Sequence, residues 1–479
     1  MITTANGSAA APGHAGTPAN RRYNAFLLLV AGLGGLLYGI DVGIIGGALP
    51  YLEATSGLTA SQLSVIVAAV LLGSVISTLF AGLLADGLGR KPLMILSGLA
   101  FVASIPIIAL SHGYAPLFFG RLLQGVSGGL IGVVVPLYLA ECLAASSRGK
   151  GTAIFQWLLT LGIVAAAVVG MYYSYRVADV AKTVGPAALL AFKDEAWRRI
   201  FWVSLPPAAL FVLGSFFVTE SPRWLFRRGK KEKTRAALLR SRTAEQAEIE
   251  IDEMEAIARA ASVPVAPGRQ IKESLLRRKY AIPFLLACVI LFCNTATGIN
   301  SIIGYNAGIL LQSGLSDLYA HWGYVIFTVV NFLLTALGMM LVDRRGRRFL
   351  LVLGTSGAAV ALIAVGVLFL RTERFTVNCR GPVQAMAGSN QELTLHFDRA
   401  AAARLLAAEG YSGSQIESGR ASLAIIYSYG DFTASTSYVS SDDPAAAPIE
   451  ITRASCVPST AIEAFFNNPF GNFRAARTA

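Results

Sequence analysis

The chain has 479 residues, of which 54% are hydrophobic and 14% are charged, with a mean hydropathy of +0.57 and a formal net charge of +12. Soluble domains carry about 25% charged residues, so this composition excludes a set of ordinary soluble domains, and it also excludes disordered, collagen-like and disulfide-dense classes. A net positive charge is typical of proteins that bind nucleic acid and of proteins that contact an anionic membrane surface. The position of the charges decides between these two classes.

Nine apolar stretches are long enough to cross a bilayer. A spanning helix needs about 20 mostly apolar residues, because its backbone amides must be satisfied internally in lipid. The first stretch lacks the small-residue cleavage site of a signal peptide. The expected spans are 24–50, 60–84, 92–112, 115–141, 151–175, 197–218, 279–312, 319–342 and 348–370.

Basic residues gather on one side of these spans. If successive loops lie on alternate sides of the membrane, 25 of the 40 Lys and Arg lie on the same side as the N-terminus. Of these 25, 15 lie between Arg223 and Lys279. The opposite loops are nearly bare, with the loop 176–196 as the exception. The positive-inside rule then places the N-terminus in the cytoplasm and the segment 371–479 outside. The charge is therefore an orientation signal, and no nucleic-acid partner is expected, since no basic stripe carries interleaved aromatic residues.

The chain divides into a leader, two groups of spans, a linker and a tail. The leader is rich in Ala, Gly, Ser and Pro, which is typical of disorder. The linker places acidic and apolar residues at helical spacing after a basic run, which predicts short amphipathic helices. The expected segments are a cytoplasmic leader 1–22, a six-helix bundle 23–219, cytoplasmic linker helices 220–278, three helices 279–370 and an extracytoplasmic loop or tail 371–479.

The tail holds no further stretch long enough to span a membrane. We expect an Ala-rich helix at Asp398–Glu409 and alternating, strand-like runs at Leu423–Tyr429 and Phe432–Val439. Cys379 and Cys456 lie in this tail, where an oxidising compartment would let them pair in a disulfide. Two cysteines give no spacing signature, so two unpaired thiols are an equal alternative.

Two similar turns lie at matching positions in the two groups of spans. GLLADGLGRK joins the second span to the third, and GMMLVDRRGRR joins the eighth to the ninth. Each combines a Gly, an acid, a Gly-Arg pair and a further base, with Asp86 and Asp343 as the acids. A turn repeated after the second span of each group indicates duplication of a six-helix unit.

With these motifs the chain resembles the major facilitator superfamily, specifically its sugar porter family. The resemblance covers about residues 24–370 and implies an all-α polytopic membrane protein with the major facilitator fold, here a six-helix N-terminal bundle and a partial, three-helix C-terminal bundle. The strings that carry it are GIDVGIIGGAL in span 1, GRLLQGVSGGLIGVVVPLYLAE in span 4, SSRGKG before span 5, TESPRWL after span 6, TGIN in span 7 and VDRRGRR after span 8.

The family has twelve helices, so the resemblance implies that the last three are missing here. The tail stands where proton-coupled myo-inositol porters of this family carry a long external loop. We expect a truncated or split reading frame rather than a natural nine-helix protein, and a separate chain that supplies the missing helices is a further candidate partner.

An acid inside an apolar span is expensive and marks a functional candidate with a partner. Asp41 lies in the Gly-rich span 1, and Arg121 at the start of span 4 is the basic residue similarly placed. The resemblance implies proton coupling, because proton symporters of the family carry an Asp and an Arg at these positions. The alternative is a static buried ion pair, or an Asp that caps a broken helix. Tyr38 either lines the site beside Asp41 or packs in the core.

Amide side chains recognise sugars because each amide both donates to and accepts from neighbouring hydroxyls. Asn294 and Thr295 stand where sugar porters usually have two Gln, so their reach is shorter and the sugar preference stays open. Tyr305 either gates a break in span 7 or lies at the lipid interface. Three further amides match substrate-binding positions of the family by resemblance, at Gln156, Asn300 and Asn331. The alternative for each of them is a hydrogen bond between helices of the bundle.

Charged residues at the cytoplasmic ends of the spans match a family network. By resemblance, this network locks the outward-open state and breaks when the bundles rock. The charged residues of the second group of spans would find their ion-pair partners on the missing helices. Small residues in span 4, at Gly125, Gly128, Gly129 and Gly132, are expected to be structural. The expected network members are Asp86, Arg90, Glu141, Arg148, Glu220, Arg223, Asp343 and Arg347.

The leading hypothesis is a secondary transporter in the cell membrane that imports a sugar or polyol with a proton by alternating access. The rivals are a facilitative transporter, a non-transporting sugar sensor or receptor whose tail is the working part, and a nonfunctional fragment. Membrane lipid is the other expected partner. An enzyme, a cofactor and a metal are not expected, because the four histidines are scattered over leader, loops and tail, at His14, His112, His321 and His396.

Overall fold

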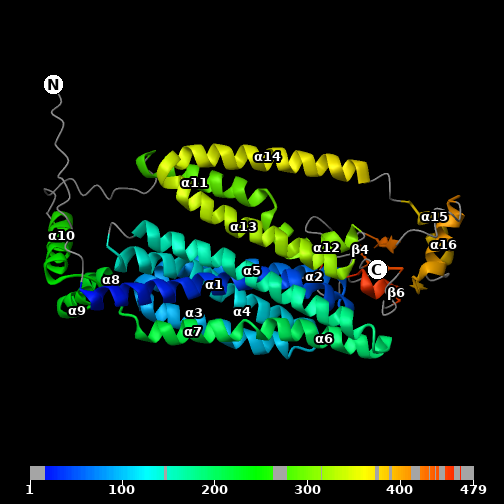
Figure 1. Cartoon of the computed structure of the whole chain (residues 1–479), viewed down its shortest axis with the longest axis horizontal. Coiled ribbons are helices and arrows are strands. Elements are labelled where there is room, and N and C mark those ends of the chain that lie inside the picture. Colours follow the sequence, from blue (N-terminus) through cyan, green and yellow to red (C-terminus); the bar gives the residue numbers. More distant parts are fainter. Residues whose placement is uncertain are drawn as a thin grey trace, which may run out of the picture.

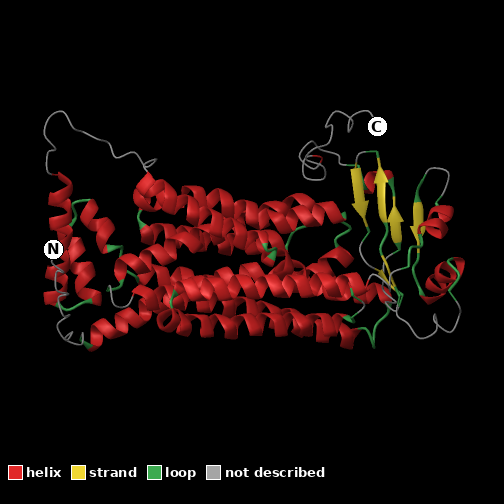
Figure 2. Ribbon diagram, turned by 90° about the horizontal axis from the view of Figure 1, so that it is seen from above, coloured by secondary structure: helices red, strands yellow, loops and turns green. Residues whose placement is uncertain are grey.

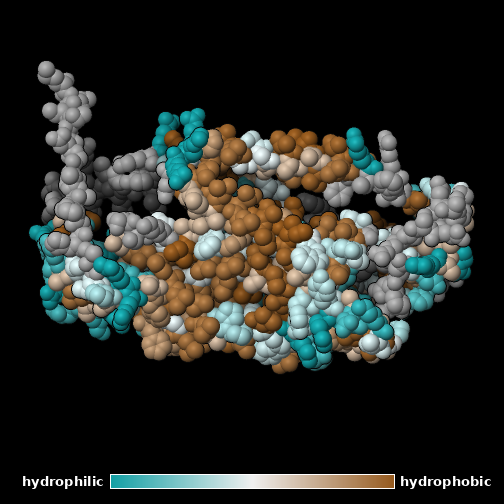
Figure 3. Space-filling model, viewed as in Figure 1, coloured by the Kyte–Doolittle hydropathy of each residue, from teal (hydrophilic) through white to brown (hydrophobic). Residues whose placement is uncertain are grey.

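The computed structural model describes residues 17–144, 148–262, 278–313, 315–372, 377–387, 391–411, 421–430, 432–436, 439–441, 448–457 and 464. Within these residues, nine helical segments are long and apolar enough to cross a membrane, which confirms the expected number. They run side by side along the long axis of the molecule (Figure 1). Apolar residues form a broad band over the spans, and hydrophilic residues gather toward the two ends (Figure 3).

Six spans make up the first half of the molecule. α1 and α2 each begin at a capping box, formed by Thr17 with Asn20 and by Thr59 with Gln62. α1 therefore starts earlier than the expected bundle start at residue 23, and most of the expected leader lies outside the described residues. The helices are α1 (Pro18–Thr55), α2 (Ala60–Leu88), α3 (Arg90–Ala109), α4 (Tyr114–Cys142), α5 (Arg148–Val180), α6 (Pro186–Trp202) and α7 (Leu205–Phe217).

The sixth span consists of α6 followed by α7 and begins earlier than expected. α5 continues to Val180 and α6 starts at Pro186, so the loop expected at 176–196 is a short turn. Arg176 and Lys193, which set that loop apart from the other bare loops, therefore lie on helices. The sequence hides the start of α6 because its charged residues lower the hydropathy of the window.

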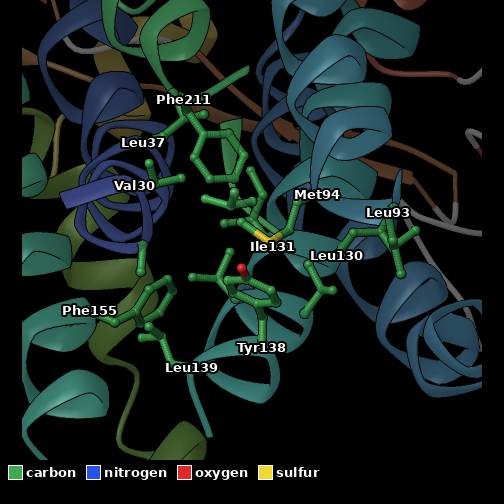
Figure 4. Close-up of a cluster of buried hydrophobic side chains, with 14 of the residues drawn as sticks. Val30, Leu37, Leu93, Met94, Leu130, Ile131, Tyr138, Leu139, Phe155 and Phe211 are labelled. Carbon is green, nitrogen blue, oxygen red and sulfur yellow. The ribbon is translucent and has the colours of Figure 1, made fainter. Parts of the chain in front are cut away.

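Small residues let the helices of the first half approach closely. A Cβ at Gly39 of α1 would collide with the carbonyl of Leu159 in α5, and a Cβ at Gly125 of α4 would collide with the carbonyl of Val70 in α2. The close pairs α1–α5 and α2–α4 depend on these glycines. Between the helices lies a buried apolar cluster (Figure 4), which includes Val30, Leu37, Leu93, Met94, Ile131, Phe155 and Phe211.

Three short helices follow the sixth span and lie across one end of the spans (Figures 1 and 2). We call this end the linker end. The amide of Asn20 in α1 donates to the carbonyls of Leu239 and Arg242, at 2.8 and 2.9 Å. Arg242 in turn donates to the carbonyl of Cys142 at 3.0 Å, which caps the C-terminus of α4. The linker helices are α8 (Pro222–Arg227), α9 (Lys231–Ser241) and α10 (Ala244–Ser262).

The second half packs on the first through only part of its surface. α12 lies against α1 and α13 against α5, whereas α14 lies against α13. In the apolar windows of the α11–α12 span and of α14, none of the residues is buried. The apolar side chains of these two windows are therefore not covered by protein. The helices are α11 (Arg278–Ala296), α12 (Ile299–Gln312), α13 (Asp317–Arg345) and α14 (Arg347–Thr372).

The tail forms a small mixed unit at the opposite end, which we call the tail end (Figure 2). Its α16 (Arg399–Ala408) confirms the expected helix and is capped by Asp398, whose side chain accepts from the amide of Ala401. Strands confirm both expected runs, and α15 (Arg380–Met386) and the short 3₁₀ helix η3 (Arg453–Ser455) were not expected. The antiparallel pairs are β1 (Leu393–Leu395) with β6 (Ile449–Ile451), β2 (Ser422–Leu423) with β5 (Val439–Ser440), and β3 (Ile426–Tyr429) with β4 (Phe432–Ser435).

The two tail cysteines are free thiols. Cys379 packs at the edge of the apolar cluster around β1, β6 and α16. Cys456 belongs to a second cluster, and its thiol donates to the carbonyl of Phe432 at 3.2 Å. The structure therefore has the unpaired alternative and not the disulfide, because the two side chains pack in different clusters.

Candidate functional site

Asp41 and Arg121 lie inside the first half, where α1 faces α4. Each residue is 1% exposed, and Arg121 Nη1 lies 3.6 Å from Asp41 Oδ1. The same nitrogen donates a 2.7 Å hydrogen bond to Oε1 of Gln124, one turn along α4. The guanidinium also lies 5.6 Å from the ring centre of Phe201 in α6. The structure thus brings the expected pair together and adds Gln124, which the sequence analysis missed.

The surroundings of Asp41 are short of hydrogen bonds. Within the described part of the chain, neither carboxylate oxygen of Asp41 has a hydrogen-bond partner, and Nε2 of Gln124 has none. α1 runs unbroken through Asp41, which excludes a role as the cap of a broken helix. A Cβ at Gly128 would lie 3.0 Å from Asp41 Oδ2 and 3.3 Å from the ring of Tyr38. Gly128 therefore leaves the space that these two side chains occupy.

The expected substrate-binding residues lie on facing elements of the two halves. Gln156 is exposed on α5, and Asn331 is half-buried on α13. Their neighbours Trp157 and Phe332 stack across the halves, with ring centres 5.1 Å apart. The sequence did not indicate that Gln156 and Asn331 each lie next to a residue of the same aromatic stack; the structure shows it. On the α11–α12 span, the exposed members are Asn294, Thr295 and Asn300.

The break in the seventh span lies at Gly298, not beside Tyr305. α11 ends at Ala296, Gly298 adopts a left-handed conformation with φ of +79°, and α12 begins at Ile299. Tyr305 lies inside α12, half-buried. Glycine adopts a positive φ without the steric cost of a Cβ, so the TGIN motif itself supplies the break. The signal in the sequence is therefore Gly298, rather than Gly304, which directly precedes Tyr305.

At the linker end, four of the expected network residues meet in the first half. Arg90 Nη2 donates to Glu141 Oε1 at 2.9 Å, and its Nη1 lies 2.9 Å from Asp86 Oδ1. Glu220 Oε1 accepts from the backbone amides of Arg90 and Lys91, at 3.0 and 3.2 Å. Burial raises the pKa of Glu220, while these backbone hydrogen bonds oppose that shift. The cluster ties α2, α3 and α4 to the segment before α8.

Of the other expected network members, the structure describes the side chain of Arg223 alone. Nε of Arg223 has no hydrogen-bond partner within the described part. The side chains of Arg148, Asp343 and Arg347 lie outside the described residues. Ser221 and Trp224 were missed and do join: Ser221 Oγ donates to Glu141 Oε2 at 2.5 Å, and Trp224 Nε1 donates to the carbonyl of Asp86 at 2.9 Å.

A polar cluster at the tail end joins the two halves and was also missed. His321, expected in a loop, is fully buried in α13, where Asp317 lies one turn before it. Asp317 Oδ2 accepts from the hydroxyl of Tyr51 in α1 at 3.0 Å and from that of Ser174 in α5 at 2.5 Å. Two ionisable residues four apart in an apolar span were the available signal.

The comparison with known families decides the class of this protein. The profile of the family described as "Sugar (and other) transporter" matches residues 27–386. The chain belongs to this family. It is accordingly an integral, multi-pass membrane protein of the major facilitator fold, and a transporter rather than an enzyme.

The names of individual relatives mention sugars and polyols. The chain is 30% identical over 346 residues to the glucose transporter GlcP of Staphylococcus epidermidis, covering 72% of each chain. It is 28% identical over 375 residues to the proton myo-inositol cotransporter of Homo sapiens, covering 77% of this chain and 55% of that protein. The structure resembles that of the proton:xylose symporter XylE bound to 6-bromo-6-deoxy-D-glucose, with a TM-score of 0.57, 26% identity and coverage of 69% of this chain and 71% of that one.

Proposed function

We propose that this sugar transporter family member imports a sugar or polyol together with a proton by alternating access. The observation that carries the proposal is the Asp41–Arg121 pair, buried inside a spanning bundle, with a carboxylate that has no hydrogen-bond partner among the described residues. Such a pair is weak evidence for stability, because the cost of removing two charges from water offsets their attraction. It suits a switch, since a single proton changes the charge balance.

The geometry suggests how a proton would release the pair. Arg121 faces two groups, the carboxylate of Asp41 on another helix, which it attracts by charge, and the amide oxygen of Gln124 on its own helix, to which it donates a hydrogen bond. A proton on Asp41 removes the electrostatic attraction but leaves Arg121 its hydrogen bond to Gln124. The electrostatic contact between α1 and α4 is then lost without leaving the guanidinium unpartnered. Rocking of the halves would deliver both the sugar and the proton.

We place the substrate between the halves, beside the Trp157–Phe332 stack. Gln156 and Asn331 flank that stack on α5 and α13, and Asn294, Thr295, Asn300 and Tyr305 belong to the adjoining span. Amides suit hydroxyl groups, and an aromatic face suits the apolar face of a sugar ring. The named relatives act on glucose, xylose or myo-inositol, which sets the panel of candidates.

For orientation, we propose that the linker end faces the cytoplasm and the tail end faces outward. The basic residues of α9 and of the start of α1 support this, through the positive-inside rule. The linker-end cluster of Asp86, Arg90, Glu141 and Glu220 would hold the first half rigid as it rocks. The exposed apolar faces of α11 and α14, which include Phe284 and Phe292, suit contact with lipid.

Uptake into proteoliposomes tests the proposal. Vesicles that contain the full chain would be given labelled glucose, xylose or myo-inositol, with and without an inward proton gradient. We expect accumulation of at least one solute that collapses when a protonophore removes the gradient. Accumulation that survives the protonophore would contradict proton coupling, and saturable binding without any uptake would favour the sensor alternative.

A further inference from the structure

A polar seam joins the two halves at the tail end. It consists of Tyr51 on α1, Ser174 on α5, and Asp317 and His321 on α13. One carboxylate oxygen of Asp317 accepts from both hydroxyls, and the other lies 3.4 Å from Nδ1 of His321. Asp317 therefore binds both α1 and α5 with a single side chain.

His321 extends the seam into the interface. Its ring stacks on that of Tyr51, with ring centres 5.7 Å apart and an angle of 6° between the planes. Its Nε2 lies 3.4 Å from the carbonyl of Gly47, and the hydroxyl of Tyr324 donates to the carbonyl of Gly43 at 2.9 Å. Positions 317, 321 and 324 share one face of α13, so that face is directed at α1.

The glycines of α1 make this approach possible. A Cβ at Gly46 would lie 2.8 Å from the carbonyl of Ile303 in α12 and 2.9 Å from the ring of Tyr324. The second half can come this close to α1 only where α1 lacks side chains. The chain thus combines a glycine face on α1 with a polar face on α13.

We infer that Asp317 and His321, with Tyr51 and Ser174, form the gate that closes the tail end between transport steps. This rests on the proposed alternating access, which requires the halves to separate at each end in turn. The hydrogen bonds that Tyr51 and Ser174 donate to Asp317 both cross from one half to the other. Water can replace these bonds when the gate opens, so a polar seam opens at a smaller net cost than an apolar one of the same size.

A matched control lies one residue from His321. Trp322 Nε1 donates to the hydroxyl of Tyr175 at 3.0 Å, and this bond also joins α13 to α5. Trp322 and Tyr175 are 40% and 46% exposed, whereas His321 is fully buried. Loss of this surface bond should leave the gate closed, because its donor and acceptor already face the surroundings.

Thiol labelling of the full chain in proteoliposomes tests the gate. The five native cysteines are replaced by alanine, and Ala307→Cys places a reporter at a fully buried position of α12. A membrane-impermeant maleimide is then added on the tail side. We expect Asp317→Asn and His321→Gln each to raise the labelling rate about tenfold, equivalent to about 1.4 kcal/mol, and Trp322→Phe to leave it unchanged. Unchanged labelling in both gate variants would overturn the inference.

A second measurement covers the case in which the gate variants fold poorly. Ser174→Cys with Asp317→Cys would be joined by a short, cleavable bifunctional thiol reagent. We expect sugar uptake to stop on cross-linking and to return on cleavage, and uptake that continues while the link is intact would overturn the gate. The labelling assay needs no sugar. Raised labelling without uptake of any solute therefore refutes the proposed transport alone, and unchanged labelling with intact uptake refutes the gate alone.

Discussion

Arg121 donates a 2.7 Å hydrogen bond to Gln124 on its own helix, while its closest approach to Asp41 on α1 is 3.6 Å. The contact between these two side chains is therefore electrostatic, and the hydrogen bond of Arg121 stays within α4. A buried guanidinium that loses its only acceptor is strongly destabilising. Gln124 spares the protein this cost, so the charge of Asp41 can change while Arg121 stays in place.

The first prediction concerns Asp41→Asn. Asn carries no charge at any pH and so resembles the protonated acid. We expect proton-driven sugar accumulation to be lost while exchange of labelled for unlabelled sugar continues, because exchange needs no net proton movement. Both rates can be measured in the same proteoliposomes. Asp179→Asn is the control, since Asp179 and its partner Lys182 are 72% and 74% exposed. Accumulation that persists in Asp41→Asn would refute the role of this acid.

The second prediction concerns Gln124→Leu, which removes the alternative acceptor. Arg121 is then left with Asp41 alone, and the ion pair tightens. We expect the proton concentration for half-maximal uptake to rise about tenfold, from the ~1.5 kcal/mol of a hydrogen bond to a charged group, while the KM for sugar stays near its original value. Gln124→Asn, which keeps the amide, should restore part of the profile. A purely structural role would lower the amount of folded protein without moving the pH profile.

The third prediction concerns helix packing in the first half. Gly39→Ala would place a methyl group against the carbonyl of Leu159, so α1 and α5 must move apart. We expect a loss of about 1–3 kcal/mol of stability, seen as a lower melting temperature in detergent. Gly82→Ala is the matched control, because it also lies in a helix and a Cβ there meets nothing within 4 Å. That control should be neutral or slightly stabilising, since alanine favours a helix by about 1 kcal/mol. Equal melting temperatures for the two variants would contradict the close packing.

The sequence predicted what depends on one helix at a time. Hydropathy located nine spans, and the cost of a buried acid singled out Asp41 and Arg121. It could not locate the Asp317 seam, because that depends on which face of α13 turns toward α1, and this rotation is set by packing between distant segments. Gln124 was missed for a related reason. A single amide in a span has many possible roles, and only the distance to Arg121 selects one.

The last prediction concerns the two thiols of the tail. Burial raises the pKa of Cys456, and burial together with the charge of Glu409 raises the pKa of Cys379. Because the thiolate is the reactive form, we expect both to react slowly with iodoacetamide at pH 7.5, faster as the pH rises, and completely once the protein is denatured without reductant. Mass spectrometry of the tail peptides measures each site.

A variant separates this outcome from the disulfide that the sequence left open. Cys456→Ser should leave the alkylation rate of Cys379 unchanged, because the two side chains pack in different apolar clusters. If the two were bonded, the same substitution would release Cys379 and convert an unreactive site into a reactive one. A peptide that contains both cysteines linked would overturn the packing described here, since the buried Cys456 would have to leave its cluster with Phe432 to reach its partner.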